Sequence, residues 1–474
     1  MTIEAKAVGS RTPSGAGSVE VAPTTEGDKL KRNISIRHMV FMALGGSIGA
    51  GLFVGSGAAL SSGGPLSLVT NFAIVGFGVT CTMGCLGELA AAFPVAGAFY
   101  EYSRRMISEP WGFAMGWNFV FNWLIVFPFE LTVIAAQMEY WVPDLQPAYI
   151  FWHDPGAVKN GLSGFLMVFR VAGMSYGGTE LLGMTAAECK NPQKALPLAT
   201  KVVFARIFFF YIVSLLLLGF VVSSDDPGLA STGHGAKYSP FTLAAQLANI
   251  QHLPSFFNAL IVVAIVSMAN TSIFAASRAF QALCEKGMGP RWGATVKWGV
   301  PVYAFLITFI FGLIAFANLA PGGGAIFDWL LSLSGASNYY TWASICVSHI
   351  RFRKAWAAQG HDHKMLLWNS PFGAWGAWVG VIICVVGLSA NMLTAIWPVS
   401  GHDAQAVIRD NIGTVIPVVL YFGYRLWQSM VKKLKQPVLI PLDQVDVRTG
   451  IRLHVDSSSS DDLEVPSVVT VKKK

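Results

Sequence analysis

The sequence predicts an all-α polytopic membrane protein. Hydrophobic residues make up 53% of the 474 residues and charged residues only 12%, whereas soluble domains average about 25% charged residues. Phe and Trp are abundant, with 32 and 15 copies, as expected for rings that line both membrane interfaces. Apolar runs of roughly 20 residues, the length that spans a bilayer core, also recur along the chain.

The apolar runs predict about ten transmembrane helices. These runs lie near 39–60, 66–90, 113–141, 163–187, 203–222, 254–280, 300–319, 325–350, 373–397 and 412–428. The first 28 residues are instead polar and rich in Gly, Ser, Thr and Pro, so we expect no cleavable signal peptide.

Basic residues gather before the first run and in every second loop after it. They are Lys29, Lys31, Arg32, Arg37, Arg104, Arg105, Lys190, Lys194, Lys201, Lys286, Arg291, Lys297, Arg351, Arg353, Lys354, Lys364, Lys432, Lys433 and Lys435. The intervening loops carry the acids Asp144, Asp154, Asp225, Asp226, Asp403 and Asp410. Because positively charged loops stay in the cytoplasm, we expect both termini there. The net charge of +7 is then mainly a topology signal and indicates no nucleic-acid partner.

The chain divides into three predicted parts. We expect a disordered cytoplasmic N-terminal tail at 1–28, a transmembrane domain at 29–435 and a cytoplasmic C-terminal tail at 436–474, whose end has few large apolar residues to bury. Serines and lysines in the tails could serve phosphorylation or the trafficking and ubiquitin machinery, and a plain solvated tail explains them equally well. The six cysteines show no metal-like pairing, so we expect neither a disulfide framework nor a metal site.

Glycines interrupt the first predicted span. The stretch 43–57, ALGGSIGAGLFVGSG, holds six glycines, each of which costs roughly 0.5–1 kcal/mol relative to alanine inside a helix. Secondary transporters use broken helices whose N–H groups face an anionic substrate group. Close packing of small residues between helices is the alternative explanation, and this stretch alone does not separate the two.

A second interruption favours a binding site. The stretch 175–183, SYGGTELLG, joins adjacent glycines to polar groups and places Glu180 at bilayer depth. An acid inside a membrane is expensive and indicates function by default. Paired glycine-interrupted segments are the strongest sequence indication of a transporter site.

Several long motifs occur in order and resemble the fungal amino-acid permease family of the amino acid–polyamine–organocation superfamily. They are LKRNISIRHMVFMALGGSIGAGLFVGSG (30–57), GELAAAFPVAGAFYEYSRR (87–105), GGTELLGMTAAECKNPQKALP (177–197) and SMANTSIFAASRAFQALCEKGMGP (267–290). The resemblance runs over roughly 29–435. It implies proton-coupled import of amino acids at the plasma membrane, with no cofactor besides the proton gradient, and a fold of inverted repeats whose first and sixth helices are unwound.

The resemblance also implies a substrate site. The carboxylate is expected at Ser47, Ile48, Gly49, Ala50 and Gly51. The amino-group side is expected at Tyr176, Gly177, Gly178, Thr179 and Glu180. Glu130 and Glu180 are the candidates for proton coupling, and we expect Glu180 to matter more because it lies in the break itself. A structural carboxylate paired with a neighbouring helix is the alternative for Glu130.

The chain departs from the family between its third and sixth helices. YWVPDLQP (140–147) is followed almost at once by FWHDPGAVKNG (151–161), which in the family flank the fourth and fifth helices. Ten spans therefore remain where the family has twelve, and topology is kept because the loss is even. The lost fifth helix carries a lysine implicated in proton coupling. An omitted exon, a splice variant or a gene-model error explains this more easily than an evolved ten-helix permease.

Three function classes compete. An amino-acid/proton symporter leads, and a permease-like sensor without flux or a transport-impaired variant follows. An intramembrane enzyme is disfavoured, because no nucleophile, base or metal set such as GxSxG or HExxH occurs. Which amino acids are carried is not readable from these residues.

Overall fold

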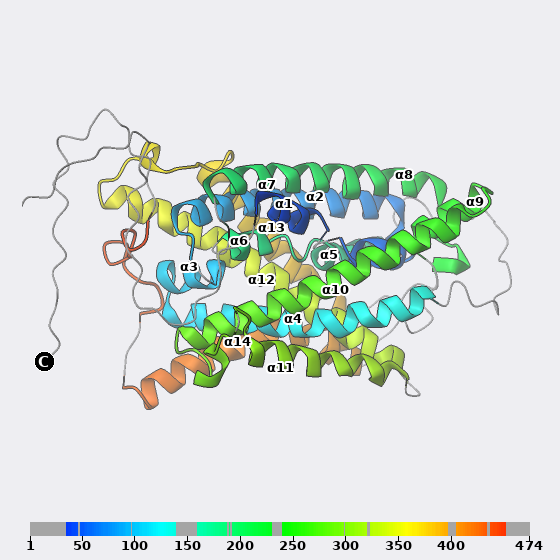
Figure 1. Cartoon of the computed structure of the whole chain (residues 1–474). Helices are drawn as coiled ribbons and strands as arrows, with labels where there is room; N and C mark the ends of the chain where they lie inside the picture. Colours follow the sequence, from blue (N-terminus) through cyan, green and yellow to red (C-terminus); the bar gives the residue numbers. More distant parts are fainter. Residues whose placement is uncertain are drawn as a thin grey trace, which may run out of the picture.

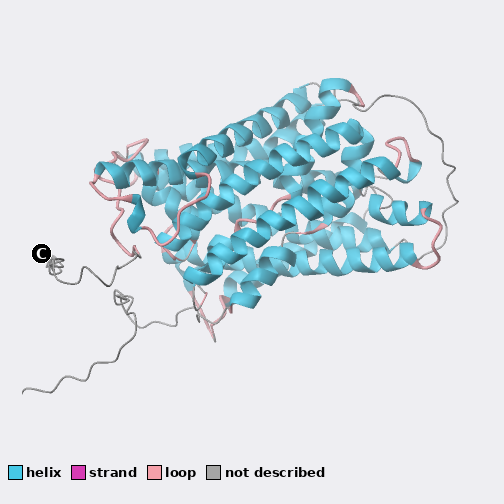
Figure 2. Ribbon diagram, turned by 90° about the horizontal axis from the view of Figure 1, so that it is seen from above, coloured by secondary structure: helices cyan, strands magenta, loops and turns pink. Residues whose placement is uncertain are grey.

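The computed structural model describes residues 35–45, 48–95, 97–138, 159–186, 189, 192–229, 239–297, 299–319, 323–396, 404–433 and 437–451. Within these residues the regular structure is helical, and long helices run side by side along one axis (Figures 1 and 2). The predicted tail at 1–28, the far end of the C-terminal tail and the junction at 139–158 lie outside the described residues.

The first half of the chain supplies the helices that hold the two interruptions. They are α1 (Ile36–Gly45), η1 (Gly51–Gly55), α2 (Ser56–Ala92), α3 (Ala98–Met106), α4 (Glu109–Met138), α5 (Gly161–Ser175) and α6 (Leu181–Ala186). The predicted spans 39–60 and 66–90 join without a loop. A kink at Gly64, whose φ is 77°, turns the chain just before Pro65, and a positive φ suits glycine there because it has no Cβ.

The second half continues the bundle. It contains α7 (Pro192–Arg206), η3 (Ile207–Val213), α8 (Ser214–Val221), η4 (Pro227–Leu229), α9 (Pro240–Leu247), α10 (Leu253–Glu285), η5 (Arg291–Ala294), α11 (Val302–Gly312), η6 (Leu313–Leu319), α12 (Gly323–Ala358), η7 (His363–Met365), α13 (Gly373–Ile396) and α14 (Ala404–Met430). Across both halves of the chain, each predicted span overlaps at least one of the observed helices.

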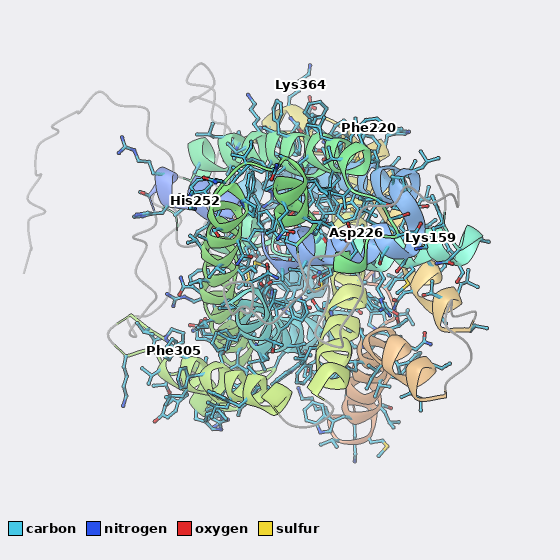
Figure 3. All side chains as sticks on the ribbon, turned by 90° about the vertical axis from the view of Figure 1, so that its right-hand side faces the viewer. Lys159, Phe220, Asp226, His252, Phe305 and Lys364 are labelled. Carbon is cyan, nitrogen blue, oxygen red and sulfur yellow. The ribbon has the colours of Figure 1, made fainter. Side chains whose placement is uncertain are left out.

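Five described helices are long and apolar enough to cross a membrane by length and composition. They are Gly51–Ala92, Glu109–Ile134, Ala195–Val221, Leu253–Glu285 and Gly373–Thr394. Large apolar side chains also point away from the bundle, as Phe220 and Phe305 do in Figure 3, where the Phe220 residue is 80% exposed. Such a surface is expected where lipid is the solvent, and the predicted membrane class is confirmed.

The two ends of the bundle differ in charge. Lys286, just after α10, lies 3.8 Å from the Glu101 carboxylate of α3, which also binds Arg104 at 2.7 Å. These contacts bring two predicted basic loops together at one end. At the other end, which faces the viewer in Figure 3, Lys159 pairs with Asp225. The arrangement agrees with the alternation of charge along the sequence.

A buried ion cluster joins α2 to α12. The Glu88 carboxylate accepts from the Arg353 guanidinium at 2.6 and 2.8 Å and lies 3.1 Å from His349 Nε2. It also accepts from the backbone N–H of Ser370 at 2.6 Å. Because Glu88 is fully buried, removing the Arg353 guanidinium would leave an uncompensated charge.

A C-terminal segment, residues 437–451, packs on the end of the bundle that carries α3. The backbone carbonyls of the segment accept hydrogen bonds from Arg105 and Arg351. Val445 and Val447 are buried in the main core. The predicted C-terminal tail therefore begins with a docked segment.

Candidate functional site

The first span breaks where the glycines cluster. Helix α1 ends at Gly45, Ile48 and Gly49 are not helical, and the helix resumes at Ala50. Leu52 N bonds back to Gly49 O at 3.2 Å, so the Ala50 N–H group belongs to the first turn, where donors have no helical partner. Of the predicted carboxylate-binding residues, Ser47 lies outside the described residues.

The second break falls at 176–180. Helix α5 ends at Ser175 and α6 begins at Leu181, with turns between them. Gly178 has a φ of 92°, a conformation that strongly favours glycine. The prediction of two unwound helices is confirmed.

The two breaks meet in space. A Cβ added at Gly51 would come within 2.7 Å of the Ser175 Cα atom, so these two backbones touch. The glycine is therefore needed for close helix packing, which is the alternative that the sequence left open.

Glu130 reaches the first break from α4. Its Oε2 atom accepts a hydrogen bond from the Ala50 N–H group at 3.2 Å, and the side chain is buried. A Cβ on Gly49 would lie 2.7 Å from Glu130 Oε1, so glycine admits this carboxylate to the backbone. A helix start is favourable for an anion because of its free donors and its dipole.

A buried cavity lies between the breaks, α4, α10 and α12. Its lining residues are Gly49, Gly51, Asn122, Trp123, Val126, Glu130, Met174, Ser175, Gly177, Gly178, Met268, Ser334 and Asn338. It has room for about one water molecule. Its walls combine glycine backbone, the Glu130 carboxylate, amides and hydroxyls with apolar side chains such as Trp123 and Met268, and a few polar groups in an apolar wall are typical of small-molecule sites.

Glu180 faces away from this cavity. Its carboxylate accepts from Gly178 N at 3.3 Å and from Trp342 Nε1 at 3.2 Å, and Arg206 of α7 interacts with it electrostatically. These partners make Glu180 a support for the second turn, and it does not line the cavity beside Glu130.

The remaining predicted residues divide in the same way. Tyr176 donates its hydroxyl to Phe72 O at 2.9 Å and stacks on Tyr211 with ring centres 4.4 Å apart, so its ring faces α2 and η3. Thr179 donates to Tyr176 O at 2.5 Å. Both residues stabilise the turn, whereas Gly177 and Gly178 line the cavity.

An amide pair in the cavity wall was missed by the sequence analysis. Asn122 Nδ2 donates to Asn338 Oδ1 at 3.1 Å, and Asn338 Nδ2 donates to Gly173 O at 3.1 Å. The signal was available, because a buried polar residue inside a predicted span is itself an indication of function.

Facing helix breaks around a buried polar cavity, in a bundle of membrane helices, are typical of transporters with discontinuous helices. A profile of the family described as "Amino acid permease" matches residues 38–151 and 147–440. The chain belongs to the amino acid permease family.

The relatives include fungal amino-acid permeases that match most of this chain. "Amino acid transporter 1" of Schizosaccharomyces pombe is 35% identical over 504 residues, with 92% of this chain and 85% of the relative covered. "Amino-acid permease inda1" of Hypocrea atroviridis is 37% identical over 491 residues (90% and 85%). A solved manganese transporter from Eremococcus coleocola has a TM-score of 0.46 and 13% identity, covering 82% of this chain and 92% of that chain. That likeness supports no inference.

The match is interrupted where two helices are expected to be missing. Its two parts meet at 147–151, between the motifs that flank the fourth and fifth family helices. The 504-residue alignment includes only 92% of a 474-residue chain, so several tens of the relative's residues face gaps in this chain. Two spans with their connections account for a gap of that size.

Proposed function

We propose that this chain imports amino acids across the plasma membrane by proton symport, with both termini in the cytosol. The family and its relatives support an amino-acid substrate, and the basic end of the bundle supports the orientation. The observation that carries the mechanism is the hydrogen bond between Ala50 N–H and the Glu130 carboxylate.

The substrate carboxylate and Glu130 compete for the same donor. An amino acid presents the chemical group that Glu130 already presents to the start of the helix at Ala50. The cavity has room for about one water molecule, so a substrate enters only when the Glu130 side chain leaves and the walls separate. Displacing Glu130 is therefore the first step of binding.

Protonation of Glu130 makes that displacement favourable. A charged carboxylate bonds to a backbone N–H about twice as strongly as a neutral acid does. A proton on Glu130 therefore frees the donor at Ala50 and also removes the repulsion between two buried anions. One proton and one substrate then enter together, which is symport.

The ammonium group of the substrate meets the second break. The backbone at Gly177 and Gly178 faces the cavity, and free carbonyl oxygens at helix breaks bind cations. Because the Glu180 carboxylate is already held by Trp342, we assign it to shaping this turn. We therefore rank Glu130 above Glu180 for proton coupling, the reverse of the order expected from sequence.

The test compares radiolabelled amino-acid uptake by Glu130→Gln and Glu180→Gln in transporter-deficient cells at matched surface expression. Wild-type uptake should rise as external pH falls. In Glu130→Gln the amide mimics the protonated acid, so uptake should lose its pH dependence, and accumulation against a gradient should fall about tenfold or more. Glu180→Gln should keep the pH dependence. A normal pH profile in Glu130→Gln refutes the coupling role.

A transport-impaired form is the second candidate, favoured by the interrupted family match at 147–151. Without the fifth family helix the first span loses a packing partner beside the carboxylate site. Uptake by the chain as it stands, compared with uptake after insertion of the missing helices, separates the two candidates. A permease-like sensor would bind amino acids in both forms with no flux in either.

A further inference from the structure

A groove separate from the transport cavity runs along α14. It holds about 540 Å³ of space and is widely open to the surface. Three elements form its walls, and the lining residues are Phe113, Gly287, Met288, Gly289, Val419, Leu420, Gly423, Tyr424 and Trp427. The lining of the groove is mostly apolar, so it favours a largely apolar ligand.

The groove lies where helices leave the bilayer. Helix α4 begins at Glu109, α10 ends at Glu285 and α14 ends at Met430, and these ends lie on the α3 side of the bundle in Figure 1. Phe113 stacks on Tyr424 with ring centres 4.0 Å apart, and Trp427 is 43% exposed. Aromatic rings of this kind mark the headgroup level.

Cations flank the open side. Lys432 Nζ lies 4.8 Å from the centre of the Trp427 ring, and Lys286 immediately precedes the lining residue Gly287. Of the neighbouring acids, Glu109 accepts from the Tyr424 hydroxyl at 3.1 Å, and Glu101 is held by two hydrogen bonds from Arg104 and lies 3.8 Å from Lys286 Nζ. Glu285 is exposed beside Lys286. The cations Arg104, Lys286, Lys432 and Lys433 outnumber these three acids, so the mouth of the groove favours an anion.

We propose that this groove binds one anionic phospholipid of the cytoplasmic leaflet. The acyl chains lie against Phe113, Val419 and Leu420, and the phosphate and headgroup lie between Lys286 and Lys432. The proposal rests on the proposed orientation, which puts this end in the cytosol, where anionic lipids are concentrated. It does not require flux, so it can fail or succeed independently of transport.

Charge complementarity favours a lipid over a second copy of the chain. In a two-fold dimer through this groove, Lys286 and Lys432 of one copy would face the same two lysines of the other copy. Repulsion between these like charges would oppose the contact. A phospholipid instead supplies both the apolar volume and the negative charge that the groove lacks.

The test is native mass spectrometry of the purified full chain with phosphatidylserine or phosphatidylcholine of identical acyl chains. We expect one phosphatidylserine to be retained preferentially. Lys286→Ala and Lys432→Ala should each weaken that preference about fivefold. Lys364→Ala, an exposed lysine on the far side of the bundle from α14 (Figure 3), is the matched control and should change nothing.

A second variant fills the groove without touching its charges. A Cβ at Gly423 meets no atom within 4 Å, so a side chain can leave the backbone there without a clash at Cβ, and Gly423→Phe should displace the lipid. Val415→Phe, 51% exposed on the same helix but outside the groove, is its control. Equal retention of both lipids, no effect of either lysine change, or dimers that Gly423→Phe abolishes would each overturn the proposal.

Discussion

Gly51 and Gly55 sit four residues apart in the first span but meet different neighbours. A Cβ on Gly51 would press on the Ser175 backbone at 2.7 Å, whereas one on Gly55 would touch a Val171 side-chain methyl at 3.1 Å. Backbone cannot move aside as a methyl group can, so we attribute a stronger constraint to Gly51 than to Gly55.

This difference gives a prediction at the residue scale. Gly51→Ala should separate the two breaks and lower uptake by at least several-fold at matched surface expression. Gly55→Ala, the matched control, should retain most uptake, because its neighbour can rotate. Normal uptake by Gly51→Ala, or the larger Gly51→Leu, would show that the breaks need not touch.

Sequence reasoning found the glycines of the site but misplaced several side chains. Two glycine clusters in predicted spans, one of them with an acid at bilayer depth, together indicate broken helices, so both breaks could be predicted. The direction of a side chain depends on tertiary packing. Nothing in SYGGTELLG indicates that Trp342 would hold Glu180, or that Glu130 would reach Ala50 from 80 residues away.

Among the elements, the C-terminal segment carries its own pH dependence. Burial by itself would raise the pKa of Asp446, but hydrogen bonds from Thr449 and from the Arg448 N–H group, with the charge of Arg105, hold that pKa below its ordinary value. A lowered pKa means that the carboxylate stabilises docking above its unfolded pKa, near 4. That contribution is lost as pH falls through the lower value.

We therefore expect Asp446→Asn to loosen residues 437–451 at neutral pH. Hydrogen exchange of the segment should become faster in this variant, and acidification below the ordinary aspartate range should produce the same change in the wild type. Asp443→Asn is the control, since Asp443 lies in the same segment and is exposed as Asp446 is, whereas the hydrogen bonds from Arg448 N and Thr449 N go to Asp446. Unchanged exchange in Asp446→Asn would remove this carboxylate from the docking contact.

Element boundaries followed from the sequence where composition changes sharply. Apolar runs end at Pro, Gly or charged residues, and the predicted spans fall on observed helices for that reason. The docked segment at 437–451 could not be foreseen, because only a few apolar residues anchor it. The hydrogen bonds that hold it come from residues far away in sequence, such as Arg105 and Arg351.

At the scale of the whole molecule, we expect the helices missing at the 147–151 junction to affect both delivery to the plasma membrane and transport. In the ten-span arrangement expected from the sequence, topology is kept, but the surface that would meet a fifth family helix would face lipid, where unpaired polar groups cost several kcal/mol each. We expect the chain as it stands to be retained before the plasma membrane, with little uptake.

Insertion of a fourth–fifth helix hairpin from a close relative should restore both surface delivery and flux. Surface biotinylation and radiolabelled uptake measure the two separately. The matched control is insertion of an unrelated apolar hairpin of equal length, which should restore neither. Strong proton-coupled uptake by the 474-residue chain itself would contradict this expectation.

The chain passes through the kink at Gly64 without a loop, so the first two spans form one continuous helical unit. With no loop between them, a tilt of the segment at the Ala50 break would be transmitted directly to α2, which is 37 residues long and runs the length of the bundle. Near its far end, α2 is held to α12 by the contacts of Glu88 with Arg353 and His349. If substrate binding tilts the first break, the Glu88 contacts are what would resist the movement of α2 at its far end, so we expect their strength to influence how far the cavity can open.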